Sequence, residues 1–240
     1  MNTEVLCQTK ISLLRAFEVR VDDHAVRLPS SAQRVLAFLA VHDRPQLRTT
    51  VATSLWMDTT EERAAANLRS ALWKLADLRD RVVDAVGGYL GLAREVEVDF
   101  RRVLLRTRDL INDSKQTEVD SEAGDLAADL LPDWDEHWLL FERERLRQLR
   151  VHALEALTRR LVADRRFAEA VDAGLSAVAA EPLRESAQRL LMEVHLAEGN
   201  FSEARRQFEL YREVLWESLA LFPSVGLCSL VGVIAPGKAM

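Results

Sequence analysis

A short pattern that occurs twice in the second half of the chain constrains the fold more than any other feature. The order Phe-x-Glu-Ala begins at Phe167 and again at Phe201, and an alanine lies four residues before each phenylalanine. The two phenylalanines are 34 positions apart, and a period of about 34 residues is typical of arrays built from pairs of helices. Each pair buries its apolar face against its neighbours, so the sequence predicts a stacked helical array here.

Apolar residues at helical spacing are expected to form the core of this array, which is predicted to begin near Asp135. The polar segment before it, Asn112–Asp125, is expected to be a loop. The array's expected role is protein contact, and no cofactor is assigned to its apolar residues. The predicted core residues are Leu154, Leu157, Leu161, Phe167, Val171, Leu190, Leu191, Phe201, Phe208 and Tyr211.

The first hundred residues begin with a different pattern, that of a small antiparallel sheet. A turn is expected at Asp22–His24, with a second strand over Ala25–Leu28. The first strand is predicted because alternate positions are apolar, namely Ile11, Leu13, Phe17, Val19 and Val21.

Three helices and a hairpin are predicted next. A helix starts after Pro29 with a serine as its N-cap, and Thr49 or Thr50 can cap a second, short helix. A third helix is expected from Thr59–Thr60 to about Arg81. The hairpin is predicted over residues 82–92, with glycines at its turn. Sheet, three helices and hairpin in this order are the parts of a winged helix. The predicted buried residues of the first and third helices are Val35, Leu36, Leu39, Ala40, Leu68, Leu72 and Leu75.

The side of the third helix that faces away from its leucines is expected to read DNA in the major groove. Arginine can bond guanine and asparagine can bond adenine there, whereas Lys74 suits a phosphate. The alternative is an ordinary solvated helix face, and Trp73 can instead pack against the second domain. The residues expected to face DNA are Arg63, Asn67, Arg69, Ser70, Trp73 and Lys74.

Two further places are candidate contacts to the DNA backbone. Thr49 and Thr50 can offer backbone N–H groups to a phosphate, although plain helix capping explains them equally well. Gly88 and Tyr89 in the hairpin would form the wing. The alternative for Tyr89 is inward packing in a purely structural hairpin.

Five stretches of the second half resemble the bacterial transcriptional activator domain. Together with the winged helix, they resemble the SARP family of antibiotic regulatory proteins and related AfsR-like activators. The resemblance implies binding to direct repeats in promoter DNA, side by side or as a homodimer, and recruitment of the RNA polymerase holoenzyme. Secondary-metabolite gene clusters are the targets that the resemblance suggests. The stretches are Leu131–Trp138, Glu142–Leu146, Ala180–Ser186, Ala197–Asn200 and Leu210–Arg212.

This resemblance implies a mainly α protein with two domains. Residues 8–98 are expected to form the winged-helix DNA-binding domain, and residues 99–235 an all-α, tetratricopeptide-like activator domain. The family's reading helix has the approximate pattern Leu-Arg-x-x-Leu-x-x-Leu-Arg, and here Ala76 replaces the final arginine. Ala32 replaces a basic residue that is common in the family. Both replacements are expected to weaken phosphate contacts.

Composition adds limits to this interpretation. The net charge of −6 does not by itself indicate a nucleic-acid binder, although a local basic face can still attract DNA. The five histidines have no metal-ligand spacing, and no nucleophile–base motif is present, so neither a metal nor enzymatic activity is expected. Two lone cysteines suggest a reducing cytoplasm, and we expect a cytoplasmic, nucleoid-associated protein without a secretory signal.

Two alternatives stay open at this point. The stretch Ser218–Gly237 has no charged residue and is long enough for a membrane anchor, but its glycines and prolines favour a last apolar helix packed on the array. The second alternative concerns function: the chain can be an interaction adaptor whose winged helix no longer binds DNA. The acidic total and the missing basic residues motivate that alternative.

Overall fold

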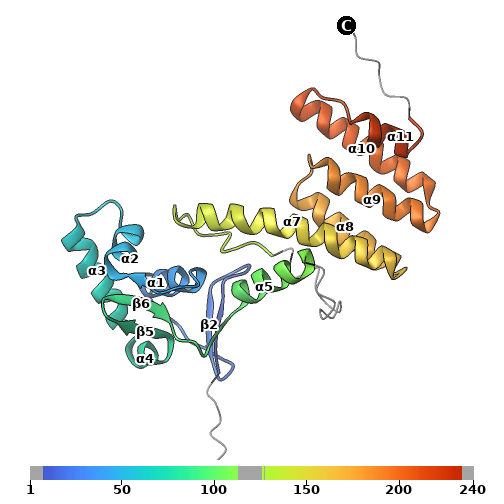
Figure 1. The fold of residues 1–240 in the computed structure, drawn as a ribbon. Helices are drawn as coiled ribbons and strands as arrows, with labels where there is room; N and C mark the ends of the chain where they lie inside the picture. Colours follow the sequence, from blue (N-terminus) through green and yellow to red (C-terminus); the bar gives the residue numbers. More distant parts are fainter. Residues whose placement is uncertain (1–7, 113–125, 127, 234–240) are drawn as a thin grey trace, which may run out of the picture. The chain divides into compact units, whose positions relative to one another are not determined.

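The computed structural model describes residues 8–112, 126 and 128–233, and its elements are labelled in Figure 1. The chain divides into two compact units. The first comprises residues 1–105 and 128–146, and the second comprises residues 106–127 and 147–240. Most of the predicted loop Asn112–Asp125 lies outside the described residues.

The first unit opens with a four-stranded sheet of order β3-β2-β1-β7. Its strands are β1 (Thr9–Ser12), β2 (Glu18–Val21), β3 (His24–Ala25) and β7 (Val96–Val98), and β1 pairs in parallel with β7. The prediction of one strand over residues 11–21 was wrong, because the chain turns back after Ser12 with Arg15 at φ 70°. Ile11 pairs directly with Val19, so odd-numbered residues face the same side before and after the turn and the alternation continues through it. The predicted second strand over Ala25–Leu28 is reduced to the two residues of β3.

Three helices follow, and they are drawn in blue to teal in Figure 1: α1 (Ser30–Val41), α2 (Arg48–Leu55) and α3 (Glu61–Trp73). The residues predicted as the core of α1 and α3 are buried. The predicted serine and threonine caps of α1 and α2 were wrong. Pro29 and Leu47 occupy the N-cap positions in extended backbone, and no side chain caps either helix.

The third helix begins where predicted and ends earlier. The Thr60 side chain accepts a hydrogen bond from the Arg63 N–H at 3.4 Å, which caps α3. The prediction that it continues to about Arg81 was wrong, because Ala76 adopts φ 47° and breaks the helix. A 3₁₀ turn (Ala76–Leu78) and α4 (Arg79–Val82) follow, and this change of path lets Leu78 join the core.

The predicted hairpin is confirmed as part of a second sheet of order β4-β6-β5. The strands are β4 (Gln46–Leu47), β5 (Val83–Val86) and β6 (Tyr89–Leu92). Gly87 and Gly88 form the turn at φ 57° and 84°, a left-handed conformation that favours glycine.

Residues 128–138 belong to the first unit although they are separated in the sequence from its main part, which ends at residue 105. Leu130 forms an antiparallel bridge with Leu14, and Leu131 N–H donates to Leu13 C=O at 2.9 Å. The Phe17 and Trp134 rings lie 5.5 Å apart. The first unit therefore combines two separate stretches of sequence, while the predicted domain boundary between residues 98 and 99 stays a prediction.

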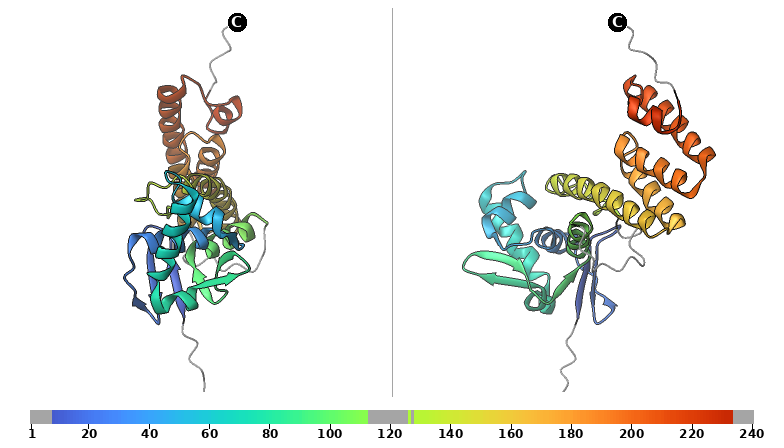
Figure 2. Two further views of the ribbon diagram at one scale, coloured as in Figure 1. Left: turned by 90° about the vertical axis from the view of Figure 1, so that its left-hand side faces the viewer. Right: turned by 45° about the vertical axis from the view of Figure 1, so that its right-hand side comes forward.

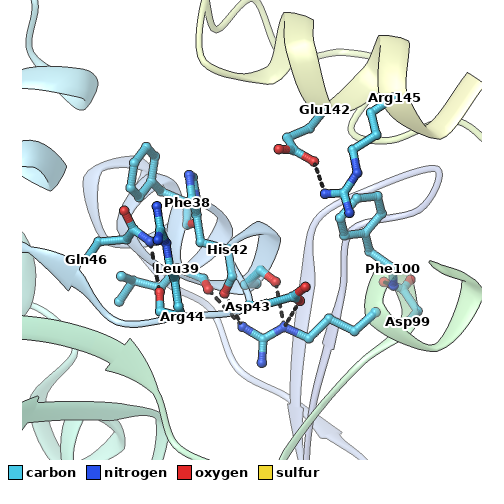
Figure 3. Close-up of polar contacts among 12 residues, drawn as sticks. Phe38, Leu39, His42, Asp43, Arg44, Gln46, Asp99, Phe100, Glu142 and Arg145 are labelled. Carbon is cyan, nitrogen blue, oxygen red and sulfur yellow. Dashed lines mark hydrogen bonds and ion pairs between the residues drawn. The ribbon is translucent and has the colours of Figure 1, made fainter. Parts of the chain in front are cut away.

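A half-buried arginine closes the end of α1. Arg101 donates to the carbonyl groups of Leu39, Ala40 and His42, which are left free where the helix ends. Figure 3 shows Leu39, His42 and Asp43 gathered at this point. Burial lowers the pKa of Arg101, and the neighbouring Asp43 carboxylate opposes that shift.

The second unit is helical, as predicted. It contains α8 (Phe167–Ala180), α9 (Glu185–Glu198), α10 (Phe201–Leu219) and α11 (Val225–Leu230), while α5 (Asp99–Ile111) and α7 (Leu139–Ala163) have residues in both units. Helix α9 packs against both α8 and α10, and the two views of Figure 2 show the three helices side by side.

Most of the predicted array core is buried, with exceptions at the repeat phenylalanines. Phe208 and Tyr211 are buried in α10, whereas Phe167 and Val171 are half-buried. The prediction that Phe201 is a core residue was wrong, because its side chain is 72% exposed. It is the first residue of α10, and the buried side of that helix is formed by residues further along, from Ala204 onward.

The uncharged segment near the C-terminus forms the predicted packed helix as far as it is described. Leu227 and Cys228 of α11 join a core cluster with Met192, Phe208 and Tyr211. Among the described residues, no helix combines the length and apolar character needed to cross a membrane.

Candidate nucleic-acid interface

The exposed side of α3 carries a straight stripe of polar side chains. Arg63, Asn67, Ser70 and Lys74 follow one another at intervals of four, three and four residues. At roughly 100° per residue, these four positions fall within about 60° of one another around the helix. A stripe of this kind has the shape needed to follow the floor of a major groove.

The opposite side of α3 fixes the helix in the first unit. Leu68 and Leu72 are buried, and α3 packs against both α1 and α2. Glu61 and Glu62 lie in its first turn, where the helix dipole favours negative charge. These acids would repel phosphate, but neither of them belongs to the stripe, which begins at Arg63.

Several hydrogen-bond donors of this surface are unused by the protein. The side chains of Arg63, Asn67 and Arg69 form no hydrogen bond or ion pair with any residue that the structure describes. Trp73 is 80% exposed and has no aromatic partner in the described part of the chain. Arg69 and Trp73 lie beside the stripe rather than on it, about 130° and 90° from its centre around the helix.

Lys74 ends the stripe and points back toward α1. Its Nζ atom donates to the Ser31 hydroxyl at 3.4 Å, across 43 positions of sequence. Both side chains are at the surface, so the contact holds the ammonium group beside the start of α1 without burying it. Sequence reasoning did not identify Ser31, because its only signal is this long-range contact.

Thr49 and Thr50 lie in the first turn of α2, both exposed. Their carbonyl groups accept from the Thr53 hydroxyl, at 2.9 Å from Thr49 and 3.3 Å from Thr50. The preceding backbone N–H, of Arg48, donates to Gly88 C=O at 3.0 Å, which ties this helix start to the wing.

The wing has an apolar outer surface. Tyr89 of β6 lies between Leu47 of β4 and Val86 of β5 in one cross-strand row, and all three are exposed, with Tyr89 at 45%. The structure therefore does not place Tyr89 inward. Asp84 is the one charged residue between Val83 and Leu92. Sequence analysis did not identify Leu47 and Val86 as wing residues. The pairing of strands in the hairpin could have placed Val86 beside Tyr89, and the third strand adds Leu47.

The two departures from the family pattern have different structural settings. Ala32 is fully buried in α1 and does not face the surface, so burial argues against a phosphate contact at this position, and the expected effect on DNA binding stays a prediction. Ala76 is exposed, but it lies beyond the end of α3. The described residues contain no cluster of three or more histidine, cysteine or acidic side chains that could hold a metal.

Residues 122–234 match the model of the bacterial transcriptional activator domain. The chain therefore carries that domain, in the half where the helical repeat lies. This match agrees with the resemblance to that domain that the second half of the sequence carries.

A solved structure has a similar fold across nearly the whole chain. It is Mycobacterium tuberculosis EmbR in complex with a low-affinity phosphopeptide, with a TM-score of 0.73 and 19% sequence identity. The match covers 94% of this chain and 64% of the EmbR chain. A search of curated protein sequences finds no match.

Proposed function

We propose that the chain is a sequence-specific DNA-binding transcriptional regulator that inserts α3 into the major groove of promoter DNA. The observation that carries this proposal is the aligned stripe of Arg63, Asn67, Ser70 and Lys74. The side chains of Arg63 and Asn67 have no hydrogen-bond or ion-pair partner among the described residues. Arg63 is suited to guanine and Asn67 to adenine. Arg69 and Trp73 would contact the side of the groove.

Backbone contacts would flank this reading helix. Lys74 would exchange its Ser31 contact for a phosphate, and the first-turn N–H groups of Thr49 and Thr50 would bind another. The wing would touch the sugar–phosphate surface through Gly88 and Tyr89. Because the wing carries Asp84 and no cation, its contribution is packing and hydrogen bonding by the Tyr89 hydroxyl rather than charge.

The match of residues 122–234 to the bacterial transcriptional activator domain supports an activator role. We propose that the regulator binds direct repeats side by side or as a homodimer and recruits RNA polymerase holoenzyme, with secondary-metabolite gene clusters as candidate targets. The helical array would supply the protein contacts. Its exposed apolar residues at the α10–α11 connection are suited to that role: Trp216, Leu219, Leu221, Phe222 and Val225.

A salt titration of duplex binding tests this proposal. The observed binding constant of a phosphate-contacting protein falls linearly with salt on logarithmic axes, with a slope of about −0.9 for each phosphate neutralised. We expect such a slope, with tighter binding to duplex than to single-stranded DNA. Absence of duplex binding at low salt would overturn the proposal.

An interaction adaptor is the second candidate, and the uncharged outer row of the wing favours it. In that case the exposed row Leu47, Tyr89 and Val86 would contact a protein, and the purified chain would not bind duplex DNA. In either case we propose a non-enzymatic protein that acts in the cytoplasm, at the nucleoid if it binds promoters.

A further inference from the structure

A salt bridge joins the segment that precedes α7 to helix α1. Arg34 of α1 lies with its Nε atom 2.5 Å from Glu136 Oε1, and its Nη2 donates to Glu136 Oε2 at 2.9 Å. The two residues are 102 positions apart in the sequence. The Glu136 side chain is 15% exposed and that of Arg34 28%, so water screens this pair less than a surface pair.

Arg34 also binds the end of α2. The same Nη2 donates to Leu55 C=O at 2.5 Å, and the guanidinium carbon lies 5.7 Å from the centre of the Trp56 ring. Leu55 is the last residue of α2, and Trp56 is its C-cap. One guanidinium therefore joins Glu136 to the point where the chain leaves α2.

The residues that follow form the turn into α3. Thr59 N–H and the Thr59 hydroxyl both donate to Trp56 C=O, at 3.3 and 3.1 Å, and Thr60 then caps α3. The direction of α3 thus depends on where α2 ends.

Nothing else polar connects this turn to the segment around Glu136 in the described residues. A hollow of about 410 Å³ separates them, lined by Arg34, residues 54–59 and residues 135–137. Glu136 itself is held in place, because Trp138 Nε1 donates to its Oε2 at 2.9 Å. The Trp138 ring packs edge-on against Phe38 of α1 at 5.2 Å.

We propose that Glu136 is a positioning residue for DNA reading: through Arg34 it holds the end of α2, and so fixes the turn from which α3 starts. The expected effect on DNA binding rests on the proposed function, whereas the effect on the turn between α2 and α3 does not. It places a residue of the activator-domain match, which begins at residue 122, in control of the reading helix.

Glu136→Gln tests the link, with Glu142→Gln as its matched control. The substitution at position 136 keeps the size of the side chain and leaves the Arg34 charge without a counterion. Glu142 pairs with Arg145 within α7, as Figure 3 shows, and its side chain is 22% exposed.

Amide hydrogen exchange is the first readout, because it does not depend on DNA. Four amide hydrogen bonds report on this region: that of Trp56 at the end of α2, that of Thr59 within the turn, and those of Arg63 and Ala64 at the start of α3. In Glu136→Gln we expect these amides to exchange roughly tenfold faster, with the β1–β2 amides unchanged and Glu142→Gln like wild type. Unchanged turn amides, or equal acceleration of the β1–β2 amides, would overturn the inference.

A second variant keeps the test valid if Glu136→Gln folds poorly. Arg34→Lys retains the positive charge but lacks the fork that spans Glu136 and Leu55, so it should loosen the same amides. If Arg34→Lys leaves them protected, the inference fails.

Duplex affinity is the last readout. We expect Glu136→Gln to weaken binding roughly three- to tenfold at an unchanged salt slope, since no phosphate contact is removed. If the duplex affinity of Glu136→Gln equals that of wild type, the inference fails but the proposed function does not. If wild type itself does not bind duplex, the proposed function fails, and the exchange result still decides whether Glu136 positions the turn.

Discussion

Lys74, the C-cap residue of α3, donates to the Ser31 hydroxyl of α1 at 3.4 Å. The contact links the end of the polar stripe to the start of the helix that supports it. Because both side chains are at the surface, a phosphate can replace Ser31 as the partner of the ammonium group at little cost.

Lys74→Ala should therefore remove one phosphate contact. We expect duplex affinity to fall for all sequences and the salt slope to become less steep by about 0.9. Ser31→Ala is the control, since it removes the hydrogen bond and keeps the charge, and its slope should equal that of wild type. A Lys74→Ala slope equal to that of wild type would show that Lys74 does not contact phosphate.

Ala76→Gly should stabilise the first unit. Ala76 has φ 47°, a left-handed conformation in which a Cβ costs about 1–2 kcal/mol, while glycine loses about 0.5–1 kcal/mol in chain entropy. We expect a net gain of about 0.5–1 kcal/mol in the free energy of unfolding, measured by urea denaturation. Ala66→Gly, in the middle of α3, is the matched control and should lose about 1 kcal/mol. A loss at position 76 would show that this backbone is not strained.

Glu185 should make the second unit sensitive to acid. Burial raises the pKa of its carboxyl, but hydrogen bonds from the Ser224 side chain and backbone and from Arg189 outweigh burial and hold it below its ordinary value. A lowered pKa in the folded state means stabilisation that is present above the unfolded pKa and lost as pH falls through the folded value.

The test compares melting temperatures of wild type and Glu185→Gln from pH 7 to pH 3. Wild type should melt higher at pH 7, and the difference should shrink below about pH 4.3, the ordinary glutamate pKa. A constant difference for Glu185→Gln would contradict the assignment.

The exposed phenylalanine of the repeat should contribute little to stability. Phe208→Ala removes a fully buried ring and should cost about 3–5 kcal/mol. Phe201→Ala removes an exposed ring and should change the free energy of unfolding by about 0.5 kcal/mol or less. Denaturant titrations of the two variants give the comparison, and a large loss for Phe201→Ala would place that ring in a packed core.

Local patterns predicted the elements that depend on near neighbours. The wing was predicted because Gly87-Gly88 allows the turn between two apolar strands, and the start of α3 because Thr60 is followed by two acids. The turn at Arg15 could not be predicted, because Ile11 pairs directly with Val19 and the alternation of apolar and polar residues continues through the turn.

Long-range relationships could not be predicted in this way. The repeat located Phe201 but not its exposure, which depends on how the first turn of α10 faces its neighbours. The Arg34–Glu136 pair joins residues 102 positions apart and has no local pattern. Helical spacing alone was enough to predict that the six candidate residues of the third helix lie away from its buried leucines. Their contact with DNA stays a prediction.

Selection of duplexes from a random library by the purified full chain tests the central claim most directly. We predict that wild type enriches a sequence containing direct repeats, and that Arg63→Ala loses preference at one position of each repeat, with no fall in melting temperature. Enrichment of no sequence by wild type, or of the same sequence by Arg63→Ala and Asn67→Ala, would contradict the claim that the exposed stripe of α3 reads DNA.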